Sequence, residues 1–306
     1  MSKVLLTGAT GFVGAHAIAP LLESGHEVHA VGRSGGSADG VRWHGVNLLD
    51  QDEALSLVSR VRAEGLLHFA WCAEHGRFWT APENLDWVAA TLRLLRGFRE
   101  VGGLRAVVAG SCAEYRWGPP VLSEAQTPLE PATLYGAAKH ATRTVATAYA
   151  AESGLELAWG RIFFVYGPGE HPDRLVPSVA RALLTGREAA MTDGTQVRDF
   201  MHVADVARAF VALLDSSATG ALNVASGEPV QLRDLIHHIA AAAGRGELVR
   251  FGARARAAGE PDELVADVRR LHEDIGFRPA LTLSTGIAET VAWWRRGPSQ
   301  APQRTG

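Results

Sequence analysis

The sequence has 306 residues, of which 47% are hydrophobic and 21% are charged, so it can bury a large apolar core in one domain or in two closely joined ones. Its formal net charge is −3, and no stretch concentrates basic residues together with aromatic ones, so the usual signatures of binding to nucleic acid or to an anionic membrane surface are missing. The expected partners are small molecules or another copy of the chain.

No apolar run reaches the length of a membrane span, and strand-forming residues begin at Lys3. The sequence therefore predicts neither a membrane anchor nor a signal peptide, and we expect a cytoplasmic protein. The two cysteines, Cys72 and Cys112, are too few for a disulfide framework or a thiolate metal site. Both are expected to be reduced, and no metal centre is predicted.

A glycine-rich motif follows the first predicted strand. Residues 7–14 read Thr-Gly-Ala-Thr-Gly-Phe-Val-Gly, between an apolar run at 4–6 and a predicted helix at 15–24. Three glycines allow a tight turn and let the backbone approach a diphosphate, which a helix N-terminus attracts. The glycines alone would also suit an ordinary turn, but their position directly after the first strand predicts a dinucleotide-binding loop.

The rest of the chain alternates between strand-like and helix-like patterns. Residues 66–70 form a continuous apolar run, typical of a strand buried on both faces, and residues 84–100 carry leucine and valine at helical spacing. This alternation predicts an α/β fold with a Rossmann-type doubly wound parallel sheet. The further predicted strands are 27–31, 41–46, 66–70, 106–110 and 157–165, and the further predicted helices are about 51–62, 84–100 and 134–152.

The end of the second predicted strand bears on the choice of cofactor. In a dinucleotide-binding fold, an acidic residue about 20 positions after the glycines holds the ribose 2′-hydroxyl, whereas an arginine suits a 2′-phosphate. This sequence has Arg33, followed by Ser34, and no acidic residue there. NADP(H) is therefore the preferred cofactor and NAD(H) the alternative, unless Arg33 is simply a solvated residue at a strand end.

Tyr135 and Lys139 are four residues apart on a predicted helix, which places the phenol and the ammonium on one face. The chain has 28 arginines but only two lysines, Lys3 and Lys139. An ammonium can bond ribose hydroxyls and lower the pKa of a neighbouring phenol, which a guanidinium does less well. The pair is thus a candidate acid–base centre rather than a coincidence of spacing. Ser111, at the carboxyl end of a predicted parallel strand, is a candidate to orient a carbonyl, although turn serines are also common there.

With these motifs, the chain resembles the extended short-chain dehydrogenase/reductase family, and within it the NAD(P)-dependent sugar-nucleotide epimerase/dehydratase group, over residues 3 to about 296. Further similarities are Tyr-Gly-Pro at 166–168, Arg-Asp-Phe-Met-His-Val at 198–203 and Asn-Val-Ala-Ser-Gly at 223–227. The resemblance implies an NAD(P)-binding Rossmann domain at residues 1–165, to which residues 203–225 return, and a smaller C-terminal substrate-binding α/β domain at 166–296. Residues 297–306 are rich in Pro, Gly, Ser and Gln, and we expect a disordered tail.

The resemblance also implies the functional residues. The implied catalytic residues are Ser111, Tyr135 and Lys139. The implied cofactor-binding residues, besides Tyr135 and Lys139, are Thr7, Gly8, Gly11, Phe12, Val13, Gly14, Arg33, Ser34, Asn47, Leu48 and Ala70. The implied substrate-binding residues are Cys112, Ala113, Phe164, Arg174, Val176 and Arg198.

Arg198 begins the Arg-Asp-Phe run, whose arginine commonly holds the substrate diphosphate in this family. The alternative for Arg198 is a surface salt bridge to Asp193 or Asp199. Phe164 stands where relatives place an asparagine, and Trp71 where many have a second alanine after the fourth strand. These departures predict an unusually aromatic sugar pocket.

The residues after Ser111 bear on the reaction. The 4,6-dehydratases carry an Asp-Glu pair directly after the catalytic hydroxyl, whereas this chain has Cys112-Ala113, which disfavours a dehydratase. Epimerase-reductases similar to GDP-fucose synthase place a cysteine two residues after the hydroxyl, and here the cysteine follows immediately. Cys112 is therefore assigned a pocket-lining role in preference to acid catalysis.

Three functions follow from these residues. The preferred one is an NADPH-dependent reductase of a keto-(deoxy)sugar nucleotide, with Tyr135 as acid/base. The first alternative is a sugar-nucleotide 4-epimerase with tightly bound NAD. The second is a non-catalytic dinucleotide-binding protein, since fold does not imply function. We also expect a homodimer, because the helices at 84–100 and 134–152 resemble those that form a four-helix dimer interface in the family.

Overall fold

The structure is a computed structural model that describes residues 2–257 and 259–297. Of the tail at 297–306, for which disorder is predicted, all but Gly297 lies outside the described residues. The elements in chain order are β1 (Lys3–Thr7), α1 (Phe12–Glu23), β2 (Glu27–Gly32), β3 (Val41–Gly45), α2 (Gln51–Val61), β4 (Gly65–His68), α3 (Glu83–Glu100), β5 (Arg105–Ser111), η1 (Cys112–Glu114), β6 (Val121–Leu122), α4 (Leu134–Ser153), β7 (Glu156–Ile162), β8 (Phe164–Tyr166), α5 (Leu175–Leu184), β9 (Ala189–Ala190), β10 (Val197–His202), α6 (Val203–Asp215), β11 (Gly220–Val224), β12 (Pro229–Gln231), α7 (Leu232–Ala243), η2 (Gly246–Leu248), β13 (Val249–Arg250), β14 (Glu263–Ala266), α8 (Arg269–Glu273) and α9 (Leu283–Arg296).

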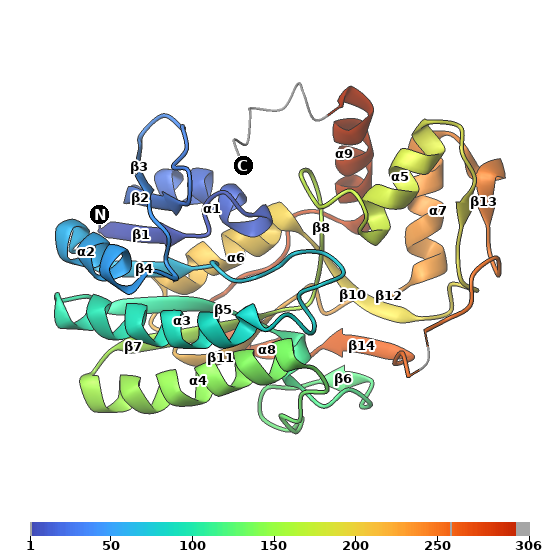
Figure 1. Ribbon diagram of the computed structural model, residues 1–306. Helices are drawn as coiled ribbons and strands as arrows, with labels where there is room; N and C mark the ends of the chain where they lie inside the picture. The colour runs from blue at the N-terminus through green and yellow to red at the C-terminus, as the bar shows by residue number, and fades with distance from the viewer. Residues whose placement is uncertain (1, 258, 298–306) are drawn as a thin grey trace.

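One large sheet organises the molecule. Its strands lie in the order β11-β7-β5-β4-β1-β2-β3, and each neighbouring pair is parallel. Helices α2, α3 and α4 cover one face, and α1 and α6 cover the other (Figure 1). The strand order reverses between β1 and β4, which is the switch point of a doubly wound sheet. The predicted Rossmann-type α/β fold is confirmed.

The central strand β1 shows why this part of the sequence is apolar throughout. Val4 and Leu6 pack in the core shared with α1 and α6, whereas Leu5 packs in the core beneath α2 and α3. All three side chains are fully buried. Because successive side chains of a strand point to opposite faces, a strand that is covered on both faces has little room for polar residues.

A second, smaller sheet joins distant parts of the chain. Its strands lie in the order β12-β10-β14-β6, and β8 pairs with β10. Helices α5, α7 and α9 gather beside this sheet, away from the large one (Figure 1). β6 precedes residue 165 yet belongs to the small sheet, whereas β11 follows it and belongs to the large sheet. The chain therefore crosses between the two sheets more than once.

The predicted strand at 157–165 is two strands in the structure. β7 ends at Ile162, and β8 begins at Phe164 and pairs with β10 instead of joining the large sheet. The apolar run continues through the break because both strands are at least half-buried. Hydrophobicity alone does not show where the chain leaves one sheet for the other.

The loop after β1 is held by backbone contacts that only glycine permits. Gly8 has a φ of +68°, and a Cβ there would lie 2.7 Å from the backbone nitrogen of Ala70. A Cβ on Gly14 would lie 2.2 Å from the carbonyl oxygen of Gly8. These contacts bring the end of β1, the first turn of α1 and the segment after β4 together at the switch point.

The described part of the chain lacks both a membrane-spanning helix and a cluster of metal-binding side chains. No helix there is both long and apolar enough to cross a membrane. The same residues include no group of three or more His, Cys, Asp or Glu side chains placed to hold a metal ion.

Candidate active site

The candidate site lies at the carboxyl ends of β1, β4 and β5, where ligands bind in doubly wound sheets. Gly11 is the N-cap of α1 and has no side chain to occupy the free N–H groups of Phe12 and Val13. With the close backbone contacts of Gly8 and Gly14, these N–H groups form a cradle that a Cβ would fill. The residues present therefore fit a dinucleotide diphosphate.

The end of β2 has no room for an acidic side chain. A Cβ on Gly32 would lie 2.7 Å from Thr10 Cγ2 and 3.1 Å from the Gly35 carbonyl oxygen. The next two residues, Arg33 and Ser34, are exposed. Arg33 is thus the charged side chain that this part of the chain offers to a ribose or its phosphate.

The segment after β3 lies beside the end of β2, because the Val46 N–H donates to the Gly32 carbonyl oxygen at 3.2 Å. In it Asn47 is exposed, and its side-chain oxygen accepts from the Leu49 N–H. Leu48 is buried. The structure thus brings this predicted cofactor-binding segment towards Arg33.

Thr7 ends β1, and its side chain contacts His68 on the neighbouring strand β4. Its hydroxyl oxygen lies 2.6 Å from Nδ1 of His68 on β4, whose Nε2 lies 3.1 Å from the hydroxyl of Thr91 on α3. All three side chains are fully or nearly fully buried. Burial lowers the pKa of His68 to about 3, so the ring is neutral and can bond two hydroxyls. This chain of contacts fixes β1 against β4 beneath the site.

Ser111 ends β5 and caps the short helix η1. Its hydroxyl accepts from the Ala113 N–H at 3.2 Å, and its own backbone N–H donates to Glu114 Oε1 at 2.9 Å. This reciprocal arrangement is a capping box. It holds the Ser111 side chain at the carboxyl edge of the sheet, while Cys112 and Ala113 are buried behind it.

Tyr135 lies in the first turn of α4, whose N-cap Thr133 accepts from the Gly136 N–H. Its phenol hydrogen-bonds with Ser111. Burial raises the pKa of Tyr135 above its ordinary value, and both the Ser111 bond and the positive charge of Arg174 oppose that rise. The phenol is therefore protonated at neutral pH in the free protein.

Lys139 lies one turn along α4 and is 3% exposed. Its Nζ donates to the Ala109 carbonyl oxygen at 2.8 Å and lies 3.8 Å from the centroid of the Trp71 ring. The Tyr135 ring is farther, with its centroid 6.0 Å from Nζ. Burial lowers the pKa of Lys139 to about 7, and the Glu114 charge opposes that shift.

Aromatic rings surround the Tyr135 phenol. Phe78 and Trp79 pack edge-on against the Tyr135 ring, with centroids 5.0 and 5.7 Å away, and Trp79 also meets Trp117. The Arg174 guanidinium lies 5.9 Å from the centroid of Phe78. The site therefore combines an apolar wall with one exposed cation beside a serine and a tyrosine.

Arg198 forms a salt bridge, but to a different partner from those named in the sequence-based alternative. It is 4% exposed and pairs with Glu260 at 2.8 Å, rather than with Asp193 or Asp199. Its guanidinium lies 5.6 Å from the centroid of Phe164, and its charge acts on the Cys112 thiol. Burial raises the pKa of Cys112 to about 12, so the thiol is uncharged.

Val176 differs from the other predicted substrate residues. It is 1% exposed and packs in the apolar core of α5, α7 and α9. Near it in the chain, Glu170 is also buried, and burial raises its pKa to about 8. One Glu170 carboxylate oxygen, Oε2, has no hydrogen-bond partner within the described ranges.

Sequence reasoning missed several polar residues that hold the site. Glu114, Arg161 and Asn84 are each almost fully buried, and Asn84 accepts from the Trp71 indole at 2.8 Å. Two local signals were available. An acidic residue three positions after Ser111 matches a capping box, and an arginine inside the apolar run at 157–165 implies a buried partner.

Comparison with known proteins supplies the context for this geometry. The model of the NAD dependent epimerase/dehydratase family matches residues 4–225. The UDP-glucose 4-epimerase of Corynebacterium glutamicum is 30% identical over 315 residues, covering 95% of this chain and 94% of that relative. The dTDP-4-dehydro-6-deoxy-D-allose reductase of Streptomyces bikiniensis is also 30% identical over 315 residues, covering 95% and 96%. A solved complex of the Thermus thermophilus UDP-glucose 4-epimerase with NAD is similar with a TM-score of 0.84 and 28% identity, covering 97% and 99%.

The buried ammonium of Lys139 generates the first prediction. The unfolded chain binds its proton up to about pH 10.5, whereas the folded chain releases it near pH 7, so wild-type stability rises with pH across that window. Lys139→Met should be more stable than wild type by about 1–4 kcal/mol at pH 7, with a gap that narrows towards pH 10.5. Urea unfolding of the free protein at several pH values measures the gap.

Lys3→Met is the matched control, because Lys3 is the second lysine of the chain and lies at the start of β1. The difference in unfolding free energy between Lys139→Met and wild type should depend on pH. A difference that does not change with pH, or an equal pH dependence for Lys3→Met, would contradict the prediction.

Proposed function

This chain belongs to the NAD dependent epimerase/dehydratase family, and we propose that it reduces a keto-(deoxy)sugar nucleotide with NADPH. It is an NAD(P)-dependent enzyme that acts on a nucleotide-linked sugar, in agreement with the resemblance to extended short-chain dehydrogenases/reductases. The observation that carries the proposal is the pairing of Ser111 with Tyr135 at the carboxyl end of β5, one helical turn from the buried Lys139.

Each of these side chains has a role in the proposal. Tyr135 gives a proton to the sugar oxygen, Ser111 orients that oxygen, and Lys139 bonds the ribose of the cofactor. A bound nicotinamide dinucleotide supplies the hydride. Because burial raises the pKa of Tyr135, the phenol carries the proton that a reductase needs to donate.

The cofactor preference is supported by the end of β2. The bare backbone at Gly32 excludes an acidic side chain, and the exposed Arg33 follows it with Ser34. A guanidinium makes charge-assisted hydrogen bonds with phosphate oxygens. Cells usually keep the phosphorylated dinucleotide reduced, so a site for the 2′-phosphate favours net reduction.

The alternative function is a sugar-nucleotide 4-epimerase that keeps NAD bound. The epimerase relative from Corynebacterium glutamicum and the reductase relative from Streptomyces bikiniensis share the same identity with this chain, 30%, so both reactions have equal support from relatives. An epimerase must first remove a proton from the sugar and then return it, whereas the phenol here is protonated in the free protein. A non-catalytic dinucleotide-binding protein would leave the Ser111–Tyr135 pairing without a use.

The substrate is proposed to lie between the two sheets, with the large sheet holding the cofactor. Arg198 and Arg174 are the cations offered to a nucleotide diphosphate, with Arg198 first leaving Glu260. Phe164 and the neutral Cys112 line the pocket, and Ala113 supports it from η1. Val176 supports the pocket from the core.

A homodimer is proposed through α3 and α4, which lie side by side in Figure 1. Leu85 on α3 is 62% exposed and Val145 on α4 is 52% exposed, so both helices present apolar side chains to solvent. A hollow lined by Leu92, Ala146 and Tyr149 lies between the same helices. Burying this surface against a second copy would remove apolar area from water.

The second prediction tests the acid. Tyr135→Phe should lower turnover of a keto-sugar nucleotide by roughly 10²–10⁴, because it removes a general acid–base group. Affinity for the dinucleotide, measured by fluorescence titration, should remain nearly unchanged. Tyr149→Phe on the same helix is the control and should retain activity. Turnover of Tyr135→Phe within a few-fold of wild type would overturn the assignment.

The third prediction separates the two cofactors. Arg33→Ala should lower kcat/KM for NADPH by a factor equivalent to about 1.5–3 kcal/mol, because one charge-assisted phosphate contact is lost. The kcat/KM for NADH should change little. Arg42→Ala, an exposed arginine on β3, is the control. Protein that purifies with tightly held NAD, and that interconverts two sugar nucleotides without added cofactor, would favour the epimerase instead.

The fourth prediction concerns assembly. Light scattering at micromolar concentration should give a dimeric mass, and Val145→Glu should shift it towards the monomer because a carboxylate would be buried in an apolar interface. Leu104→Glu is the control, since Leu104 is 55% exposed but lies outside both helices. A monomeric wild type would contradict the proposal.

A further inference from the structure

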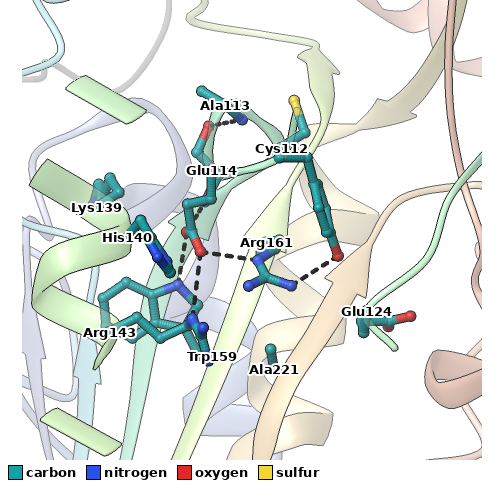
Figure 2. Close-up of polar contacts among 12 residues, drawn as sticks. Cys112, Ala113, Glu114, Glu124, Lys139, His140, Arg143, Trp159, Arg161 and Ala221 are labelled. Atoms are coloured by element: carbon teal, nitrogen blue, oxygen red, sulfur yellow. Dashed lines mark hydrogen bonds and ion pairs between the residues drawn. The ribbon is translucent and has the colours of Figure 1, made fainter. Parts of the chain in front are cut away.

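Glu114 is a fully buried acidic group beneath the site. It lies in η1, and its side chain is 0% exposed. Its carboxylate accepts from the Ser111 N–H at 2.9 Å, from Trp159 Nε1 at 2.8 Å and from Arg161 Nε at 2.9 Å. Arg143 Nε lies 3.7 Å from Oε2. Figure 2 shows the carboxylate between α4 on one side and the side chains of β7 on the other.

Two glycines make room for this arrangement. A Cβ on Gly110 would lie 2.1 Å from Trp159 Nε1 and 2.6 Å from Glu114 Oε1, so any other residue would displace the hydrogen-bonded Trp159 and Glu114 side chains. A Cβ on Gly136 would lie 2.2 Å from the Ala113 carbonyl oxygen. The turn that carries Glu114 is therefore in direct backbone contact with the residue that follows Tyr135.

The network continues away from the site through neutral groups. Arg161 Nη1 donates to the Tyr115 hydroxyl at 2.8 Å, and that hydroxyl donates to Asn223 Oδ1 at 2.8 Å. Asn223 is itself held by the Leu122 and Asp267 carbonyl oxygens. The Tyr115 hydroxyl thus holds the Arg161 guanidinium on one side, and Glu114 accepts from its Nε on the other.

A buried charge pair is not required for a stable turn. Ion pairs of this kind can often be replaced by uncharged residues without loss of stability, because desolvation of the charges offsets their attraction. A neutral Gln could also accept from the Ser111 N–H. The Glu114 carboxylate lies against Gly110. Lys139 Nζ donates to the carbonyl oxygen of the adjacent Ala109, so neighbouring residues of β5 hold the two charges near each other. The charge of Glu114 acts on both Lys139 and Tyr135, which gives it a role beyond capping.

We propose that Glu114 is a positioning residue, whose buried carboxylate both fixes the Ser111 turn and supplies the negative charge that stabilises the ammonium of Lys139. The ammonium is buried, where it contacts the Ala109 carbonyl oxygen and the Trp71 ring. Glu114 raises the pKa of Lys139 against the effect of burial. The part of this proposal that concerns catalysis rests on the proposed function.

Titratable and charged groups lie on several elements around Lys139, and Glu114 is the one whose charge opposes the effect of burial on the Lys139 pKa. Glu114 and the uncharged Cys112 thiol come from η1, and the neutral His68 ring comes from β4. Tyr135, His140 and Arg143 lie on α4, and Arg161 lies on β7. Glu114 is the acidic group in this set.

The composition of the chain offers a direct test. Because it has only two lysines, protein labelled with ¹³C at lysine Cε gives two NMR signals, and Lys3→Arg identifies which belongs to Lys139. The Lys139 signal should titrate near pH 7 in the free wild type. In Glu114→Gln the midpoint should fall by about 0.5–1 pH unit, as expected for loss of one charge at this range.

Glu124→Gln is the matched control. Glu124 is partly buried and, like Glu114, accepts from a backbone N–H, that of Asn223 at 2.8 Å, but it lies on the far side of Arg161 (Figure 2). Its replacement should leave the Lys139 midpoint unchanged. An unchanged midpoint in Glu114→Gln, or an equal fall in Glu124→Gln, would overturn the proposal.

Glu114→Gln leaves Arg161 without its charge partner, so this variant could fail to fold. Glu114→Gln combined with Arg161→Met removes both charges and serves in its place. Because Glu114 is the charge that acts on Lys139, the double variant should also show a fall in midpoint, smaller than that of Glu114→Gln because the Arg161 cation is lost as well. A wild-type midpoint in a folded double variant would overturn the proposal.

A second measurement addresses catalysis. In the reductive direction, the alkaline limb of the pH profile of kcat/KM should shift to lower pH in Glu114→Gln, by about as much as the Lys139 midpoint falls. Purely structural damage would lower kcat/KM at every pH without moving this limb. Absence of turnover by wild type on any sugar nucleotide would count against the proposed function alone, because the NMR titration needs no substrate. If turnover by Glu114→Gln falls while the alkaline limb of its pH profile stays in place, the proposed role of Glu114 in catalysis is overturned.

Discussion

Backbone-to-backbone contact at three glycines is the constraint on which the rest of the structure depends. Gly8 touches the segment after β4, Gly14 touches Gly8, and Gly136 touches η1, each at a distance that no Cβ could tolerate. The first two contacts shape the loop at the switch point, and the third sets α4 against the turn of Ser111. The cofactor cradle and the Ser111–Tyr135 pairing are thereby built on the same rigid sheet edge.

What the sequence could predict was local in the chain. The glycine loop, the alternation of strands and helices, and the spacing of Tyr135 and Lys139 each lie within a short window, and the fold that follows from them is confirmed. The contacts that escaped prediction join distant residues. Arg161 and Glu114 are 47 positions apart, and Arg198 and Glu260 are 62 apart, so no periodicity or motif relates them. The break between β7 and β8 was hidden for a related reason, because both strands are at least half-buried and differ only in the sheet that receives them.

The interior beneath the site carries an unusual amount of charge. Lys139, Glu114 and Arg161 are at most 3% exposed, and removing such groups from water is costly unless each is paired or hydrogen-bonded. The chain meets this requirement with backbone groups and neutral side chains, including the Ala109 carbonyl oxygen and the Trp159 indole. The resulting network links α4, β5, η1 and β7, so the electrostatics of the site and the packing of the sheet cannot be altered independently.

The ion pair between Arg198 and Glu260 has a consequence for ligand exchange. A carboxylate already occupies the guanidinium, so an anionic ligand that reaches Arg198 has to displace an internal competitor tethered to the same chain. Such a competitor acts at a fixed effective concentration and returns as soon as the ligand moves away. Apparent affinity is then lower than the contact alone would give, while dissociation is faster, because the departing anion leaves no bare buried cation behind.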